Sequence, residues 1–448
     1  MSLSLSSDNM NIDKVESEVI ERVKPDEKER RAVRSVSDEL LEVLDDELEG
    51  KKKPEVVGSV SKGTYLKNPD IDIFVKFPLS TPREEMEENI LRVGRKILED
   101  TEEKYAEHPY IYGYYKDREV DIVPCYDIED ITDMKSAVDR TPFHTEYVIE
   151  NLAEDQKEEA ILFKAYLEGI GAYGAKAEVW GFSGYLCELL ILHYGSFEKV
   201  LKAAKDWKPG KTIEVVKGEK DFEDPLVVID PVDPERNVAS PISLGTFSLF
   251  ILSSKKFLEE PRMSFFFPND VVTKDREQLF DLINGRDTEF IGLKVTKPDV
   301  VEDNLYPQVQ KCMRRLLYHA SHKDFEILHA DYFVKDDEIL LIFEVENPIL
   351  PKIRRHRGPP VWVDNTEEFI DKYGEDVYLE EDRLWVDKER EHTEIKETFI
   401  EIMKEVDLGS DLNSLFPREC EFMGKDEMLE EEKGSLSEFL DNSFPWER

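Results

Sequence analysis

Apolar and polar residues recur with two different periods over the first third of the chain. From Lys14 to Glu49 the apolar residues return every three or four positions, which predicts a helix that Pro25 interrupts or turns. The segments EVVGSVSKGTYL and DIDIFVKF predict two strands joined by a turn that contains glycine. A helix over residues 84–103 and a hairpin of YIYGYY with REVDIVPCY around Lys116 and Asp117 follow. This order predicts a mixed sheet with helices packed on it.

The pattern changes twice in the rest of the chain. Apolar stretches between Thr145 and Tyr194, and again up to about Leu258, predict helices with a strand at LVVIDPVDP between them. After Pro261 the segments RMSFFFPND, EFIGLKVTKP, FEILHADYFVKDDEILLIFEVE and VYLEEDRLWVDK predict strands. The acidic end after Gly424 predicts a partly ordered helix or tail. We therefore expect an α+β chain with three domains, residues 1–145, 146–260 and 261–448.

Length and composition support folded domains inside the cell. A chain of 448 residues exceeds one hydrophobic core, and 40% hydrophobic residues favour folded rather than disordered segments. We find no apolar run long enough to cross a membrane, and the start MSLSLSSDNMNIDK lacks the features of a secretory signal. The cysteines lie far apart and form no CxxC pair, which argues against a zinc ribbon. We expect a soluble, cytoplasmic protein without a membrane partner.

The net charge of -41 is the unusual bulk property. Such a surface repels itself and other polyanions over a Debye length of about 10 Å at 0.1 M salt, which shrinks to about 3 Å at 1 M. One interpretation is adaptation to a salt-filled, acidic-proteome cytoplasm. The other is a moderately acidic mesophilic protein, and the 38 lysines keep that interpretation open. The charge does not indicate a reaction.

Two aspartates follow a glycine–serine pair after ten intervening residues, in the order Gly58, Ser59, Asp70, Asp72. Alternate side chains of a strand share a face, so both carboxylates point the same way while the isoleucines between them point into the core. Like charges this close raise each other's pKa, and a bound cation would relieve that cost. Mg²⁺ accepts one or two carboxylates together with phosphate oxygens.

A third aspartate, Asp121, alternates with apolar residues in REVDIVPCY. Three carboxylates around two Mg²⁺ ions are the ligand set of two-metal phosphoryl or nucleotidyl transfer. The turn at Gly58 and Ser59 could offer N–H groups and a hydroxyl to a triphosphate, and Lys62 could add positive charge. We predict that Asp70, Asp72 and Asp121 are the catalytic, metal-binding residues.

Each feature alone has a simpler interpretation. Two alternating aspartates on a strand more often lie on a solvated sheet face, and a glycine–serine turn is a weaker signal still. Their combination with a later apolar-flanked aspartate resembles the polymerase-beta-like nucleotidyltransferase superfamily. This superfamily also contains poly(A) polymerases, so an RNA tailing enzyme of that kind stays open, as does a catalytically silent RNA-binding protein that kept the fold.

Longer stretches narrow the resemblance. The chain is similar to the archaeal (class I) CCA-adding enzymes, which are tRNA nucleotidyltransferases, over nearly its whole length, less clearly after about residue 320. The resemblance implies a polymerase-beta-like head, a helical neck and a strand-rich, RNA-binding body and tail. The matching stretches are VGSVSKGTYL, DIDIFVKFP, YAEHPYIYG, EVDIVPCY, SAVDRTPFHTEY, GIGAYGAKAEVWGFSGYLCELLILHYGSF, VVIDPVDPERNVA, KPDVVEDNLYPQ and HRGPPVW.

The resemblance also implies a reaction and its ligands. CTP and ATP would donate C, C and A to the 3′ end of tRNA without a template, and the C-terminal region would grip the acceptor stem and T-arm. Lys352 to Arg357 could contribute to that grip or be an ordinary solvated loop, and a homodimer stays open. Ser59, Lys62, His144, Lys164 and Tyr173 would meet the triphosphate, with Gly58 in the turn, and Thr141 and Arg236 would read the base.

Without the resemblance, several of these residues have a purely structural interpretation. His144 could cap a helix, Lys164 could be a solvated helix position, and Tyr173 could be a loop aromatic. Arg236 could pair with a nearby aspartate. The chain also departs from the family pattern, with Asp70 for the frequent Glu, Lys62 for the usual Arg and Tyr112 for a His. A lysine replaces bidentate phosphate binding with a point charge.

Overall fold

The computed structural model describes residues 11–50, 52–105, 108–218 and 220–448. Its contacts divide the chain into two compact units, which are described separately: Met1–Asp270 with Ser443–Arg448, and Val271–Asn442. The division of the sequence into three domains stays a prediction. Within the described residues, no helix combines the length and apolar character that crossing a bilayer requires.

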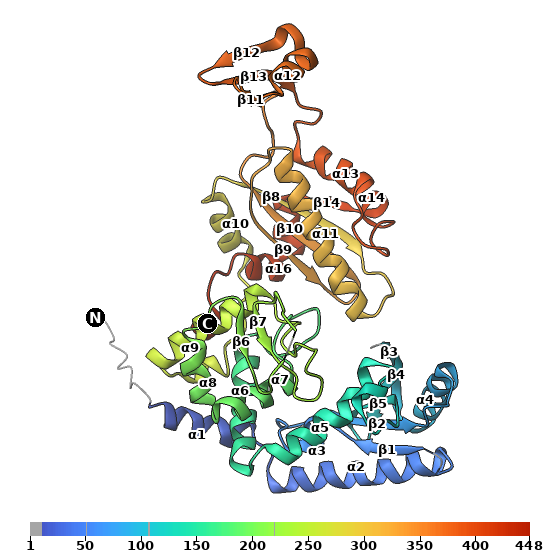
Figure 1. Cartoon of the computed structure of the whole chain (residues 1–448). Helices are drawn as coiled ribbons and strands as arrows, with labels where there is room; N and C mark the ends of the chain where they lie inside the picture. The colour runs from blue at the N-terminus through green and yellow to red at the C-terminus, as the bar shows by residue number, and fades with distance from the viewer. Residues whose placement is uncertain (1–10, 51, 106–107, 219) are drawn as a thin grey trace, which may run out of the picture. The chain divides into compact units, whose positions relative to one another are not determined.

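A five-stranded mixed sheet forms the first part of the first unit (Figure 1). Its order is β1-β2-β5-β4-β3, with β2 and β5 parallel at the centre and the other pairs antiparallel. Alternation along β2 and β5 buries the isoleucines and valines of one face against α2 and α4, as the sequence predicts. The elements are α2 (Glu27–Glu47), β1 (Lys53–Val56), α3 (Gly58–Lys62), β2 (Ile71–Phe77), α4 (Arg83–Ile97), β3 (Glu99–Tyr105), β4 (Pro109–Tyr115) and β5 (Arg118–Tyr126).

Three predicted elements of this part differ from the structure in their limits. The first helix is split at Pro25 into α1 (Ile12–Val23) and α2, whose first turn is capped by Asp26. The predicted strand EVVGSVSKGTYL ends at Val56, because Gly58 adopts a left-handed conformation and begins the short helix α3. The predicted helix over 84–103 ends at Ile97, and the polar residues after it form the exposed edge strand β3, which has no apolar alternation to reveal it.

The rest of the first unit is mainly helical, as predicted (Figure 1), and its core contains many aromatic side chains. Helix α1 packs against α6, and near the C-terminus Trp446 stacks on Phe265 with ring centroids 5.1 Å apart. Phe265 and Phe266 belong to this core, so the predicted strand RMSFFFPND is wrong. The elements are α5 (Arg140–Asn151), α6 (Glu154–Gly169), α7 (Gly184–Tyr194), α8 (Phe197–Ala204), β6 (Lys211–Ile213), β7 (Leu226–Val228), α9 (Leu244–Glu259) and the 3-10 helix η3 (Met263–Phe265), with η1 (Ile131–Asp133) and η2 (Ala137–Asp139) before them and η5 (Pro445–Glu447) near the end.

The second unit contains a four-stranded sheet in the order β14-β8-β10-β9. Helices α11 and α13 cover one face and α10, α15 and α16 the other, so β10 is buried on both sides. The predicted strands here are confirmed, whereas the long helix α11 was not predicted. The acidic end is helical. The elements are α10 (Arg276–Asn284), β8 (Glu289–Thr296), α11 (Glu302–His322), β9 (Ile327–Val334), β10 (Glu338–Val345), α13 (Ile395–Glu405), α14 (Phe416–Glu419), β14 (Glu421–Met423), α15 (Lys425–Glu431) and α16 (Lys433–Phe439).

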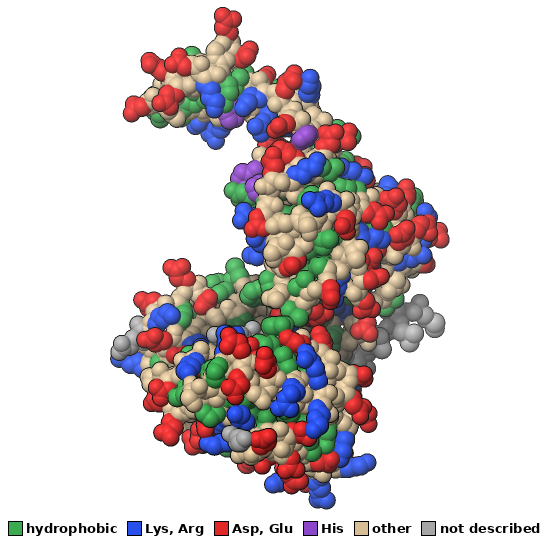
Figure 2. Space-filling model, turned by 90° about the vertical axis from the view of Figure 1, so that its right-hand side faces the viewer, with side chains coloured by type: hydrophobic (Ala, Val, Ile, Leu, Met, Phe, Trp, Pro, Cys, Tyr) green, Lys and Arg blue, Asp and Glu red, His purple; other side chains and the backbone are tan. Residues whose placement is uncertain are grey.

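A separate three-stranded sheet in the second unit carries the basic stretch Lys352–Arg357. From Ile353 on, the stretch lies on the edge strand of this sheet and is not a loop, and Lys352 directly precedes that strand. Carboxylates already pair with Arg355 (Glu380) and Lys352 (Glu389). On the face shown in Figure 2, acidic side chains are spread among basic ones and do not gather in one patch. The elements are β11 (Ile353–Pro360), α12 (Thr366–Tyr373), the 3-10 helix η4 (Gly374–Asp376), β12 (Val377–Glu380) and β13 (Arg383–Glu389), in the order β11-β13-β12.

Candidate active site

The three predicted carboxylates meet on the sheet face opposite α2 and α4. Strands β2 and β5 run parallel with Asp72 directly beside Asp121, and Asp70 immediately precedes β2. One carboxylate oxygen of each aspartate lies within 4.8 Å of the others. Period-two alternation places Asp72 and Asp121 on one face because their apolar neighbours are in the core on the other.

The electrostatics of this cluster favour a bound cation. Burial, followed by the charges of Asp70 and Asp121, raises the pKa of Asp72 to about 7. Burial is also the main cause that raises the pKa of Asp121 to about 6, against the opposing charge of Lys104. Oδ1 of Asp121 is buried and has no hydrogen-bond partner among the described residues. Three converging hard oxygen ligands with such an orphaned atom fit a divalent metal ion.

Gly58 forms the turn that brings the backbone against these carboxylates. Its φ is +67°, and a Cβ built on it would lie 2.2 Å from Oδ2 of Asp72, so only glycine fits. Its N–H donates to the Thr145 hydroxyl at 3.3 Å, and that hydroxyl donates to the carbonyl of Thr141. The turn therefore lies directly against Asp72 of β2 and is hydrogen-bonded to α5.

A cavity of about 280 Å³ opens beside the carboxylates. Ser59, Asp70, Lys164 and Tyr173 all line it, so the structure brings together four of the residues that the sequence assigned to the site. Lys164 is almost fully buried and Tyr173 is partly buried, and desolvation raises the pKa of the Tyr173 hydroxyl well above its usual range.

Lys62 and Lys164 share one buried carboxylate, Glu188 of α7. Nζ of Lys62 is 2.7 Å from Oε2 of Glu188 and Nζ of Lys164 is 2.9 Å from Oε1. Thr64 donates its hydroxyl to Oε1 at 2.5 Å and accepts a hydrogen bond from Lys164 through its carbonyl. Burial opposes ionisation, but the two lysines and these hydrogen bonds hold the pKa of Glu188 at about 2. Lys164 is therefore not the solvated helix position of the simpler interpretation.

His144 and Arg236 meet at a second buried carboxylate. Nε2 of His144 and Nη1 of Arg236 each lie 2.9 Å from Oδ2 of Asp230. His144 also stacks on Tyr185 with ring centroids 4.0 Å apart. Arg236 does pair with a nearby aspartate, and the partner is the same one that holds His144.

Thr141 and Tyr112 complete the set of predicted positions. Thr141 shares α5 with His144, and Tyr112 faces Asp121 directly across the β4–β5 pair. The ammonium group of Lys104 lies 3.5 Å from the centre of the Tyr112 ring. Tyr112 is therefore a neighbour of the third carboxylate.

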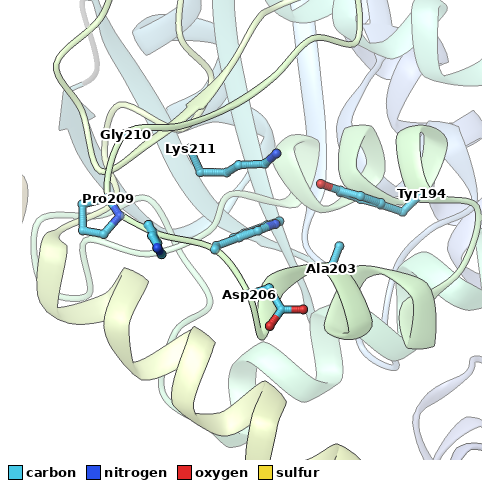
Figure 3. A pocket seen from close by; sticks show the side chains of 8 residues that line it. Tyr194, Ala203, Asp206, Pro209, Gly210 and Lys211 are labelled. Carbon is cyan, nitrogen blue, oxygen red and sulfur yellow. The ribbon is translucent and has the colours of Figure 1, made fainter.

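A further hollow of about 470 Å³ lies in the helical part of the first unit. Lys211 and Tyr194 point toward each other across it (Figure 3). None of its lining residues belongs to the sites above. They are Tyr194, Ala203, Asp206, Trp207, Lys208, Pro209, Gly210 and Lys211.

The mixed sheet, the glycine turn and the carboxylate trio together define a nucleotidyltransferase. Residues 37–148 match the nucleotidyltransferase domain family, residues 158–267 match the second domain of tRNA nucleotidyltransferases, and residues 286–423 match the C-terminal domain of CCA-adding enzymes. The chain belongs to the CCA-adding enzyme family, and its predicted α+β fold with a nucleotidyltransferase domain near the N-terminus is confirmed.

Two curated relatives illustrate the match. The CCA-adding enzyme of Methanothermobacter thermautotrophicus is 37% identical over 447 residues, which cover 96% of this chain and 98% of the relative. The CCA-adding enzyme of Halobacterium salinarum is 39% identical over 364 residues, 80% of each chain. A solved poly(U) polymerase structure aligns with a TM-score of 0.45 and 14% identity, over 56% of this chain and 94% of that one.

Glu188 and Asp230 are site residues that sequence reasoning missed. Glu188 is the one acidic residue in the apolar helix GYLCELLILHY, and a buried charge needs a partner. That signal was present in the sequence. Asp230 stands in LVVIDPVDP together with Asp233, and only the folded loop shows which of the two is buried.

Proposed function

We propose that this chain completes the 3′ end of tRNA by adding C, C and A from CTP and ATP without a template, with release of pyrophosphate. The observation that carries the proposal is the convergence of Asp70, Asp72 and Asp121 beside the Gly58 turn. Membership of the CCA-adding enzyme family over nearly the whole chain supports the choice of substrate. A tRNA substrate would place the reaction in the cytoplasm.

The trio would hold two Mg²⁺ ions. When bound, such ions lower the pKa of an attacking hydroxyl and neutralise charge on the leaving pyrophosphate. Asp70 and Asp72 would ligate both ions, and Asp121 would share the one that serves the 3′ hydroxyl. The strands fix these carboxylates in place, so the chain contributes mainly positioning and a site prepared for developing charge.

The residues around the trio would bind the nucleotide. Ser59, Lys164 and Tyr173 line the cavity next to Asp70, where a triphosphate could be held by a hydroxyl and positive charge. Lys62 would act through its charge, because Glu188 already binds its ammonium group. At the other cluster His144 would contact the triphosphate, and Arg236 with Thr141 would read edges that C and A have in common.

Single replacements of Asp70, Asp72 and Asp121 by Ala test the assignment. Each should abolish nucleotide incorporation while circular dichroism shows a folded protein, and EDTA should have the same effect on the wild type until Mg²⁺ is restored. Asp133→Ala is the matched control, because Asp133 is an exposed aspartate of the same domain. Unchanged incorporation by any of the three variants would refute that residue's role. Titration with Mn²⁺, followed by electron paramagnetic resonance, counts the ions.

Recognition of tRNA would rest on the second unit. Duplex RNA is bound mainly through shape, phosphates and 2′-hydroxyls, which requires local positive charge on a protein this acidic. Lys352–Arg357 could supply it from β11, although Arg355 and Lys352 are already paired with carboxylates. Replacing Arg357 by Ala should weaken tRNA binding and flatten its salt dependence, with no change in CTP affinity.

Light scattering distinguishes a monomer from the homodimer that the sequence leaves open.

A further inference from the structure

Asp230 is a fully buried carboxylate that accepts four hydrogen bonds, from α5, from α7 and twice from its own loop. Oδ2 accepts from Nε2 of His144 and Nη1 of Arg236, both at 2.9 Å. Oδ1 accepts from the Tyr185 hydroxyl at 3.1 Å and from the N–H of Val232 at 3.0 Å. Burying a carboxylate is costly unless it is satisfied in this way. The four donors offset the cost of burying this carboxylate, and in return the carboxylate fixes the positions of the donor groups.

The loop that carries Asp230 is closed on itself. The Asp230 N–H donates to the carbonyl of Arg236 at 3.1 Å, and the Arg236 N–H donates to the carbonyl of Asp233 at 2.9 Å. Asp230 thus fixes the backbone of Arg236 and also its guanidinium group. The amide of Asn237 anchors the loop to β7 by accepting from the Val228 N–H at 2.8 Å. Arg236 is therefore held at both ends by the same residue.

Asp230 also decides the protonation pattern of His144. Hydrogen bonds from His144 and Val232 are among the causes that hold the pKa of Asp230 at about 2 despite its burial, so it is ionised and only accepts. Nε2 of His144 must then carry a proton, and the stack on Tyr185 fixes the plane of the ring. Tyr185 is itself held by Asp230, so one carboxylate orients all three side chains.

We propose that Asp230 is a positioning residue that determines nucleotide specificity by holding His144 and Arg236 in one fixed arrangement. The inference rests on the proposed function, in which His144 contacts the triphosphate and Arg236 reads the base. Because one carboxylate holds both His144 and Arg236, a nucleotide binds well only when its triphosphate reaches His144 and its base reaches Arg236 at the same time. The residue would act on selectivity as well as on affinity.

Asp230→Asn is the direct test, because the amide keeps the shape but replaces one acceptor oxygen with a donor that faces other donors. We expect the KM for CTP and ATP to rise about tenfold, and the preference for CTP and ATP over UTP and GTP to fall by a similar factor. A purely structural role would lower the amount of active enzyme and leave both the KM and the selectivity unchanged. That result would overturn the inference.

Two further variants separate the outcomes. Asp233→Asn is the matched control, because Asp233 lies in the same loop and pairs with Arg140 at 3.3 Å, outside the cluster; it should keep wild-type selectivity. If Asp230→Asn does not fold, Tyr185→Phe removes one donor to Asp230 and leaves a ring that can still stack on His144. We expect Tyr185→Phe to have a smaller loss of selectivity in the same direction, and wild-type selectivity would overturn the inference.

A double variant tests whether Asp230 acts through Arg236. Arg236→Ala alone and Arg236→Ala combined with Asp230→Asn should have the same selectivity, because the side chain that contacts the base is already absent and Asp230 can no longer orient it. Additive losses would contradict the inference. The two proposals also fail differently. A wild type that adds no C or A to tRNA refutes the proposed function, whereas a selective wild type with an equally selective Asp230→Asn variant refutes only this inference.

Discussion

Gly58→Ala should inactivate the enzyme by displacing one carboxylate without unfolding the domain. The new Cβ would lie 2.2 Å from Oδ2 of Asp72 and 3.1 Å from its Cγ. Non-bonded heavy atoms settle at about 3.5 Å or more, so the carboxylate must move by about 1 Å. Asp72 lies on a central strand beside Asp121, so its backbone cannot follow and the side chain must rotate away.

The size of the effect follows from this displacement. A misplacement of about 1 Å in a catalytic group costs on the order of 100-fold in rate, or about 2.7 kcal/mol of transition-state stabilisation. The left-handed backbone adds a separate cost of about 1–2 kcal/mol to folding stability, because φ at Gly58 is +67°. We therefore expect kcat for CTP incorporation to fall about 100-fold, with a modest loss in melting temperature.

Gly50→Ala is the control that isolates the carboxylate contact. Gly50 has a φ of +63°, and no atom of the described residues lies within 4 Å of a built Cβ, so its replacement has the backbone cost alone. Both variants should lose similar stability, and only Gly58→Ala should lose activity. If kcat of Gly58→Ala stays within about threefold of Gly50→Ala, the position of Asp72 does not matter for the reaction and the reasoning is wrong.

Other features of the molecule give three more predictions. In EDTA at pH 8, Asp72→Asn should melt at a higher temperature than the wild type yet be inactive. Burial and like charges raise the pKa of Asp72 to about 7, so its ionisation costs folding stability as the pH rises from about 4 to 7; a lower melting temperature would contradict this. Glu188→Gln should cost about 3–5 kcal/mol in chemical denaturation, because Lys62 and Lys164 lose their buried counter-charge. The pKa of Glu188 is lowered to about 2, so its contribution to folding stability is present above about pH 4.5 and is lost as the pH falls toward 2. Glu188→Gln should therefore lose less stability than the wild type over this pH range. A loss of stability below about 1 kcal/mol at neutral pH would refute the role of the cluster. If the charge of -41 is a salt adaptation, activity should rise with KCl toward molar concentrations, and an optimum at low salt would favour the ordinary acidic protein.

The sequence was sufficient where an element has a strict period. Apolar residues flank Asp72 in β2 and Asp121 in β5, which predicted that each carboxylate points away from the apolar face of its own strand. The hairpin between β4 and β5 was predicted from the pair Lys116 and Asp117, which adopt positive φ values of 51° and 61°. Local chemistry determines these features, so they can be read from the sequence.

The sequence was insufficient where distant segments decide the outcome. Strand β3 is an exposed edge without alternation, and α3 forms because Gly58 must turn against Asp72, a residue of another element. The partner of Lys62 is 126 positions away, and only the fold places Glu188 beside it. The nearby aspartate that could pair with Arg236 was open in the sequence, and the fold shows that it is Asp230. The family resemblance assigned roles to Lys62 and Arg236 but none to Glu188 or Asp230.

Supplying CTP alone to tRNA that lacks its CCA end tests the central claim most directly. A chain that adds C, C and A should extend this tRNA by two C residues and stop, and should complete the end with a single A once ATP is present. Electrophoresis at single-nucleotide resolution distinguishes these products from the longer A tails of a poly(A) polymerase. No incorporation of C, or a tail of many A residues from ATP alone, would contradict the account.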